Sequence, residues 1–226
     1  MNIVAVTLVR DSEKFIIPHL KMYTGVTRNI VLMIPQVLKG GASGHSQSRD
    51  NSIALIKKHC PEVEIFETET DEWGNKLFNE AIELAGDCDK VVALHADVVM
   101  NQENWLKLKE ILEVTDADVF KLNMNNCTIN YYIDFDHGVR DCLDIEPIAV
   151  RGGFRYDGTI YSVEGKSVFT IENEITVHHF CGWKGIFTDP RWKAGIIPSE
   201  SLVYIHQLKP EGGWLKCPDD IVEAFV

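Results

Sequence analysis

The stretch Val91-Val92-Ala93-Leu94-His95-Ala96-Asp97 decides how the chain is organised, because four apolar residues run directly into two polar side chains that can bind metals. An unbroken apolar run of this length is typical of a strand covered on both faces, as in a parallel sheet. In open α/β sheets, ligands bind just beyond the carboxyl ends of the strands. We therefore expect His95 and Asp97 to lie at the ligand-binding edge of a parallel sheet.

Strand-like and helix-like patterns alternate before this stretch. Apolar strands are predicted at 3–8, 30–34 and 63–66, and helices from near Glu13, over 50–59 and over 73–85. Pro18 then falls in the first turn of the first helix, where it is tolerated, and Gly86 ends the third helix. Alternation of this kind predicts a mostly parallel sheet flanked by helices and joined by right-handed crossovers.

The chain changes character after an amphipathic helix marked by Trp105, Leu108 and Leu112. Short strand-like runs follow at 119–122, 128–133, 159–163, 167–171 and 175–180. No internal repeat or low-complexity tract separates the two halves. We expect residues 1–226 to form a single α/β domain, with residues 1–100 as one half and the β-rich residues 101–226 as the other.

The composition excludes several classes of protein. The chain has 22 Lys and Arg against 34 Asp and Glu, a formal net charge of −12, and no basic run, which argues against a nucleic acid partner. No apolar run approaches the roughly 18–20 residues that span a bilayer, so no transmembrane segment is expected. The start lacks a basic leader, and the six cysteines form no Cys-x-x-Cys pair. We expect a soluble, cytoplasmic protein with free thiols.

Asp97 has two interpretations from the residues alone. A carboxylate at the end of a strand can hold a divalent cation, which would neutralise a diphosphate leaving group. The alternative is that Asp97 only caps the turn that follows the strand. Both interpretations stay open at this stage.

A family resemblance connects three segments of the first 100 residues. Val9-Arg10-Asp11-Ser12-Glu13 and the helix after it resemble the opening of family 2 glycosyltransferases of the GT-A fold. Trp73-Gly74-Asn75-Lys76-Leu77-Phe78-Asn79-Glu80-Ala81 resembles the helix before their metal-binding strand. Leu94-His95-Ala96-Asp97 stands where those enzymes carry an apolar strand ending in Asp-x-Asp. The order and separation of the three segments make the resemblance more specific than any one of them.

The resemblance implies a Rossmann-like GT-A sheet with a nucleotide-sugar-binding half (1–100) and an acceptor-side half (101–226). It implies that Asp97 binds Mn²⁺ or Mg²⁺. The residues it places around the nucleotide-sugar are Thr7, Arg10 and Glu13 at the nucleoside, and Lys76 and Asn79 near the donor.

This sequence departs from the family pattern in two places. His95 replaces the first Asp of the motif, which favours Mn²⁺ through an imidazole ligand or else points to activity without a metal. The end of the second strand, Ile34-Pro35-Gln36, lacks the acidic residue that many relatives carry there. The second departure leaves the nucleobase open, and UDP is only the commonest choice in the family.

The second half supplies further candidates that the resemblance suggests. His178 and His179 must face opposite sides of a strand, and we favour His179 as the late histidine that completes the metal or diphosphate site. Lys184, Arg191 and Lys193 could offset the charge of a diphosphate, although a solvated basic loop explains them as well. Trp183 and Trp192 would stack on a sugar or simply pack.

Inverting transfer needs a carboxylate base for the acceptor hydroxyl. The segment from Arg151 to Glu164 resembles a family region that ends in a catalytic acid, which makes Glu164 the first candidate and Asp157 the second. A surface carboxylate is the alternative interpretation of either. Four further aspartates of the acceptor-side half could act instead: Asp134, Asp136, Asp141 and Asp144.

The sequence thus predicts a glycosyltransferase that moves a sugar from a nucleotide-diphosphate sugar to an acceptor hydroxyl, with inversion. The acceptor, whether a glycan, a lipid-linked glycan, a protein or a small molecule, stays open. One alternative is a catalytically silent protein that binds sugar nucleotides or assists assembly. Another is a sugar-1-phosphate nucleotidyltransferase, but Val9-Arg10-Asp11-Ser12 is not the glycine-rich turn those enzymes carry after the first strand.

Overall fold

The computed structural model describes most of the first half of the chain and parts of the second. The described residues are 1–10, 12–13, 15–34, 51–68, 70, 74–129, 143–158, 163–171, 175, 177–179, 205–208 and 214–216. Their helices are α1 (Ile16–Met22), α2 (Ser52–His59), α3 (Asn75–Ala85) and α4 (Gln102–Val114). Their strands are β1 (Ile3–Val9), β2 (Arg28–Met33), β3 (Glu64–Glu67), β4 (Lys90–His95), β5 (Val98–Val99), β6 (Val119–Ile129), β7 (Leu143–Arg151), β8 (Val168–Ile171), β9 (Val177–His179), β10 (Ile205–Leu208) and β11 (Trp214–Lys216).

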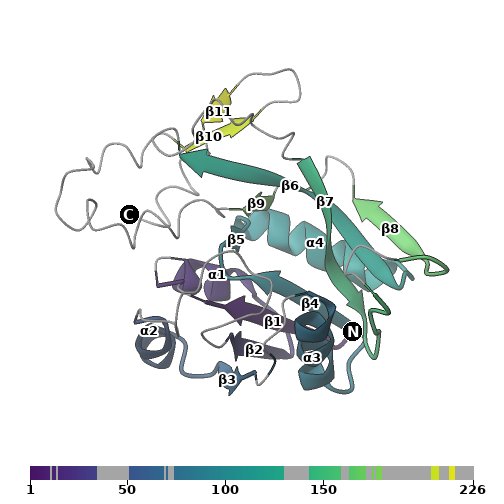
Figure 1. Ribbon diagram of the computed structural model, residues 1–226, viewed down its shortest axis with the longest axis horizontal. Helices are drawn as coiled ribbons and strands as arrows, with labels where there is room; N and C mark the ends of the chain where they lie inside the picture. The colour runs from purple at the N-terminus through teal and green to yellow at the C-terminus, as the bar shows by residue number, and fades with distance from the viewer. Residues whose placement is uncertain are drawn as a thin grey trace.

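The strands form a mixed sheet in the order β11-β10-β6-β7-β4-β1-β2-β3 (Figure 1). The four strands of the first half run parallel to one another, in the order β3-β2-β1-β4. β7 is antiparallel to β4, and β6 is antiparallel to β7, so β6 again runs in the direction of β4. The predicted α/β sheet, with a parallel first half and a β-rich second half, is confirmed.

β1 lies in the interior of the sheet, and all seven of its residues are buried. Its side chains alternate between two faces. Val4, Val6 and Leu8 join the cluster that α3 covers, while Ile3 and Ala5 join the cluster that α4 covers. Helices therefore cover both faces of this part of the sheet, which explains why β1 and β4 are nearly unbroken apolar runs.

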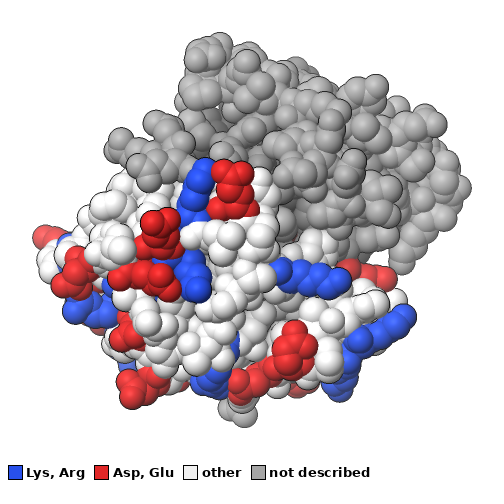
Figure 2. Space-filling model, turned by 180° about the vertical axis from the view of Figure 1, so that it is seen from behind, with Lys and Arg blue, Asp and Glu red and all other residues white. Residues whose placement is uncertain are grey.

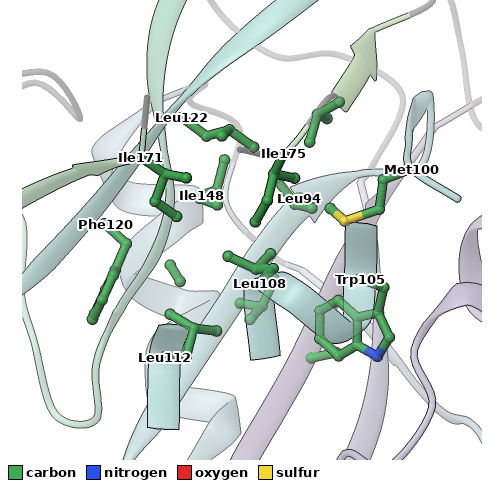
Figure 3. Packing of buried hydrophobic residues seen from close by; sticks show 14 of the residues in the cluster. Leu94, Met100, Trp105, Leu108, Leu112, Phe120, Leu122, Ile148, Ile171 and Ile175 are labelled. Carbon is green, nitrogen blue, oxygen red and sulfur yellow. The ribbon is translucent and has the colours of Figure 1, made fainter. Parts of the chain in front are cut away.

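The core under α4 joins the two halves of the chain. Figure 3 shows Trp105, Leu108 and Leu112 of α4 packed below side chains from β4, β6 and β7, among them Leu94, Phe120 and Ile148. Trp105 is fully buried, and its indole N–H donates to the carbonyl of Thr24 at 2.9 Å. The helix is fixed at its start by Asn101, whose side chain accepts from the Asn104 N–H at 2.8 Å.

Several elements differ from the sequence-based expectation, α1 and β7 among them. α1 begins at Ile16 rather than near Glu13, because Ser12 forms a hydrogen-bonded turn before the helix. The Ser12 hydroxyl donates to the carbonyl of Arg10, and the Ser12 carbonyl accepts from the N–H groups of Phe15 and Ile16. β7 was not predicted, since Pro147 interrupts its sequence. The β6–β7 register shifts between Phe120 and Lys121, where Pro147 stands opposite, and this irregularity accommodates the proline.

Charges of both signs mix on the described surface. On the face shown in Figure 2, acidic and basic side chains lie side by side over the described part of the molecule. Several form ion pairs, such as Lys107 with Glu103 at 2.7 Å on α4. Among the described residues, no helix is both long and apolar enough to cross a membrane.

We predict that Leu108→Ala lowers the free energy of unfolding by about 2–5 kcal/mol, because Leu108 is fully buried under the sheet. Leu106→Ala is the matched control: it makes the same change on the same helix at a side chain that is 51% exposed, where about 0.5 kcal/mol or less is expected. Urea unfolding of both variants measures the difference. Equal losses in the free energy of unfolding would mean that α4 does not bury its Leu108 face against the sheet.

Candidate functional site

The carboxyl ends of β1 and β4 meet at one edge of the sheet. Leu8 and His95 are register partners, and the N–H of Ala96 donates to the carbonyl of Leu8 at 3.0 Å. β2 ends at the same edge, where the N–H of Ile34 donates to the carbonyl of Val9 at 3.0 Å. Arg10, half-buried, follows β1 directly. The polar residues after β1 and β4 therefore lie together at the carboxyl edge, as predicted from their sequence positions.

Asp97 stands in the turn between β4 and β5 and is only 4% exposed. The short strand β5 pairs antiparallel with β9, with Val98 opposite His179 and Val99 opposite His178. β9 also lies beside β6, parallel to it. The fold thus brings the backbone of His179 next to the residue that follows Asp97, although the two positions are far apart in the sequence.

A cation at Asp97 would need ligands beyond the side chains that the structure describes. Among the side chains that the structure describes, no three His, Cys, Asp or Glu gather closely enough to hold a metal by themselves. A cation bound at Asp97 would complete its coordination with the oxygens of a diphosphate, which is how Mg²⁺ and Mn²⁺ commonly bind at phosphate-transfer sites. The described donors thus fit a metal only together with a phosphate ligand.

His95 is half-buried and faces α3. Its ring meets Phe78 edge to face, with the centroids 5.8 Å apart and the planes at 77°. Phe78 meets Tyr156 in the same way at 6.3 Å, and Tyr156 meets Phe154 at 4.9 Å. These aromatic contacts orient the imidazole of His95 on the face of the sheet that α3 covers.

Thr7 lies inside the protein rather than on the surface of a nucleoside pocket. It is fully buried, and its hydroxyl lies 3.1 Å from Nε2 of His19. Nδ1 of His19 lies 2.5 Å from the carbonyl oxygen of Val98, and the hydroxyl of Tyr23 lies 3.0 Å from Nε2. The structure therefore places Thr7 beneath the carboxyl edge, in a hydrogen-bonded group that also includes β5.

Asn79 is engaged with the backbone of the segment after β7. Its amide nitrogen donates to the carbonyl of Tyr156 at 3.0 Å, and its amide oxygen accepts from the Tyr156 N–H at 2.8 Å. Asn79 is buried, whereas Lys76, on the first turn of the same helix, is exposed. No local sequence signal indicates this pairing, because the partner lies in the other half of the chain.

Glu13 forms part of a groove beside the carboxyl edge. Its carboxylate accepts from the backbone N–H and the side-chain amide of Asn51, both at 3.3 Å. The groove has a volume of about 720 Å³ and runs between α1, α2 and the start of α4, with Lys21, His59 and Asn101 among its lining residues. Glu13 thus lies at the same end of the sheet as Arg10, but toward the α2 side.

Glu164 lies near the start of β6, at the opposite end of the strands from the carboxyl edge. It is exposed in a turn closed by the N–H of Lys166 donating to the carbonyl of Val163, just before Ser167 hydrogen-bonds Asp118 at the start of β6. Figure 1 shows the turn before β8 on the side of the N-terminus, away from the arrowheads of β1 and β6. The structure therefore does not bring Glu164 to Asp97. Asp157 is exposed beside α3, next to Tyr156.

The remaining candidates are only partly described. Asp144, on β7, is the register partner of Met124, which also pairs with Val177 of β9, so its backbone lies toward the carboxyl edge. The other candidates lie outside the described residues: Asp134, Asp136, Asp141, Trp183, Lys184, Arg191, Trp192 and Lys193.

Comparison with solved structures identifies the fold. The chain superposes on a fragment of TarS from S. aureus, residues 1–349, with a TM-score of 0.52 and 12% sequence identity, over 83% of this chain and 63% of that one. It also superposes on the same fragment in complex with UDP-GlcNAc (TM-score 0.51, 12% identity, 79% of this chain and 58% of that one) and with UDP (TM-score 0.51, 12% identity, 79% and 60%).

TarS is a GT-A-type glycosyltransferase, so the chain has a GT-A fold, as the sequence resemblance implied. The chain spans less than two thirds of the length of the TarS fragment. No family model matches the sequence, and no curated protein matches it by sequence comparison. The likeness at 12% identity extends to the fold alone.

We predict that Asn79→Ala destabilises the protein, because it leaves the buried N–H and carbonyl of Tyr156 without their partner, at about 1–3 kcal/mol for each group. Lys76→Ala, on the same helix, should leave the unfolding free energy within about 0.5 kcal/mol of wild type, because its side chain is exposed. Thermal unfolding of the two variants tests the assignment. An Asn79→Ala protein of unchanged stability that had lost ligand binding would instead show that Asn79 contacts the ligand directly.

Proposed function

We propose that the chain is a glycosyltransferase that takes a sugar from a nucleotide-diphosphate sugar, a UDP-sugar in the first instance, and transfers it to an acceptor hydroxyl. One observation carries the proposal: His95 ends the central strand β4 and Asp97 follows it directly, at the carboxyl edge of a GT-A sheet and beside β9. The solved neighbours that support UDP are TarS complexes with UDP and UDP-GlcNAc. Residues 101–226 form the acceptor-side half in this proposal, continuous with the donor half through one sheet.

A divalent cation at this edge would be held by Asp97, with His179 and His95 as further ligands. Bound there, it would neutralise the charge that develops on the diphosphate as the bond to the sugar breaks. Asp97 is only 4% exposed, which would keep its carboxylate oriented and partly shielded from water. Mn²⁺ fits this set better than Mg²⁺, because imidazole suits transition metals more than it suits Mg²⁺.

The donor would lie along the carboxyl edge between Arg10 and Lys76. Arg10 follows β1, the neighbour of β4, and Lys76 stands exposed on the first turn of α3, the helix that leads into β4. Lys184 and Arg191 are proposed to pair with the diphosphate from the acceptor-side half. Thr7 and Asn79 act from beneath, Thr7 by holding the ring of His19 and Asn79 by holding the segment after β7.

Transfer with inversion would need a carboxylate near the acceptor hydroxyl, on the side of the sugar opposite the diphosphate. Glu164 lies at the opposite edge of the sheet from Asp97, so the proposal does not depend on it. Asp144 is the acidic candidate whose described backbone position is nearest to β9. Asp157 remains a candidate at the rim beside α3.

The second candidate function is a catalytically silent protein that binds sugar nucleotides. It is favoured by His95, which replaces the first carboxylate of the family motif, and by the position of Glu164 away from Asp97. Both functions require the donor site, and only the first requires turnover. Hydrolysis or transfer of the donor therefore separates them.

We predict that UDP-GlcNAc or UDP raises the melting temperature of the protein in the presence of Mn²⁺. A ligand at 100 times its dissociation constant stabilises the folded state by about 2.7 kcal/mol, which corresponds to roughly 5–10 °C for a domain of this size. ADP with Mn²⁺ is the control for nonspecific effects of a diphosphate. The absence of a shift with every UDP ligand would contradict the proposed donor.

We predict that Asp97→Asn removes the part of that shift that depends on Mn²⁺ and abolishes turnover, because the amide lacks the charge that holds the cation. His95→Asp should act in the other direction and allow Mg²⁺ to replace Mn²⁺, because it restores an oxygen ligand. Isothermal titration of each variant with Mn²⁺ and with Mg²⁺ in saturating UDP measures the metal affinities, and hydrolysis of the donor measures turnover. Unchanged Mn²⁺ affinity in Asp97→Asn would remove Asp97 from the metal site.

A further inference from the structure

A fully buried histidine connects three elements directly beneath the carboxyl edge. His19 of α1 is 0% exposed. Its Nδ1 lies 2.5 Å from the carbonyl oxygen of Val98 on β5, and its Nε2 lies 3.1 Å from Oγ1 of Thr7 on β1. The hydroxyl of Tyr23, at the end of α1, lies 3.0 Å from the same Nε2. No sequence motif singles out this histidine.

The direction of one of these bonds follows from its chemistry. A carbonyl oxygen only accepts, so Nδ1 must carry a proton and donate it to Val98. Burial raises the pKa of the Tyr23 phenol, so Tyr23 keeps its proton and remains a hydrogen-bond donor inside the protein. Tyr23 is itself held by the ring of Trp105, edge to face at 5.0 Å. The imidazole is therefore fixed from both of its nitrogens.

The backbone on both sides of Asp97 is anchored. On one side, the N–H of Ala96 donates to the carbonyl of Leu8 on β1. On the other side, the carbonyl of Val98 accepts from His19. β5 has only two residues, and it pairs with β9 at His178 and His179. A strand this short has few hydrogen bonds of its own, so the bond from His19 is a large part of what holds it in place.

We propose that His19 is a positioning residue for the metal site: by anchoring the Val98 carbonyl, it fixes the turn that carries Asp97 and the short strand β5, which pairs with the backbone of His179. This inference rests on the proposed function, because it assigns His19 a role toward the cation that Asp97 would bind. Residues that orient metal ligands without touching the metal typically change metal affinity about 10–100-fold when they are replaced. Thr7 and Tyr23 hold the ring, and His19 holds β5.

Three substitutions separate the bond to Val98 from the rest of the group. His19→Gln places an amide near the position of Nε2 and loses the donor to Val98. His19→Asn places its amide nitrogen near the position of Nδ1 and can keep that donor. Tyr23→Phe removes the phenol that contacts Nε2 and leaves the bond between His19 and Val98 in place. All three alter the same buried group, so their melting temperatures provide the measure of general destabilisation.

The experiment measures two quantities in the full chain: Mn²⁺ affinity in saturating UDP, by electron paramagnetic resonance, and hydrogen exchange of the peptide that contains residues 97–100. We expect His19→Gln to weaken Mn²⁺ binding at least 10-fold and to speed exchange of this peptide. We expect Tyr23→Phe to change Mn²⁺ affinity by no more than about 2-fold, and His19→Asn to recover most of the loss.

The outcomes separate the two proposals. If wild type binds Mn²⁺ with UDP, but His19→Gln and Tyr23→Phe lose affinity equally and in proportion to their melting temperatures, His19 is only structural and the inference is overturned while the proposed function stands. If wild type binds neither UDP nor Mn²⁺, the proposed function fails, and the metal role of His19 fails with it. In that case, exchange of residues 97–100 still decides whether His19 anchors β5.

Discussion

The pairing of β1 with β4 is the constraint on which the rest of the structure depends. Both strands are buried on their two faces, between α3 on one side and α4 on the other, so their residues are mostly apolar, and the buried polar exceptions Thr7 and Lys90 are hydrogen-bonded inside the protein. The register that sets Leu8 beside His95 makes both strands end at the same level. The polar residues that follow them are therefore forced to one edge.

The second half of the chain completes that edge by returning to the same sheet. β6 and β7 add to the side of β4, and β9 then lies between β6 and the short strand β5. Asn79 secures this return from the first half, since its amide forms two hydrogen bonds with the backbone of Tyr156. The proximity of Asp97 to the backbone of His179 is a consequence of these pairings rather than of any local signal.

The site combines an ordinary architecture with an unusual residue. The GT-A fold is shared with TarS, whose complexes hold UDP and UDP-GlcNAc, and the proposed metal site of this chain lies at the end of β4. His95, at the end of β4, is half-buried, and its ring packs against Phe78. An imidazole is neutral or cationic where a carboxylate would be anionic, so under the proposed function the metal preference would depend on this residue.

The sequence by itself determined the elements of the first half, because hydrophobic period and strand-end polarity are local properties: β1, β2, β4 and α3 fall within a few residues of their predicted ranges, and α4 contains the apolar residues that indicated it. It also indicated Asp97, since a polar residue after an apolar strand is visible locally. Only the tertiary structure showed that Glu164 lies at the far edge, that Asn79 binds Tyr156, that Pro147 stands in a strand, and that His19 lies under β5. These depend on contacts between distant parts of the chain, and such contacts are set by strand order and register, which no single segment encodes.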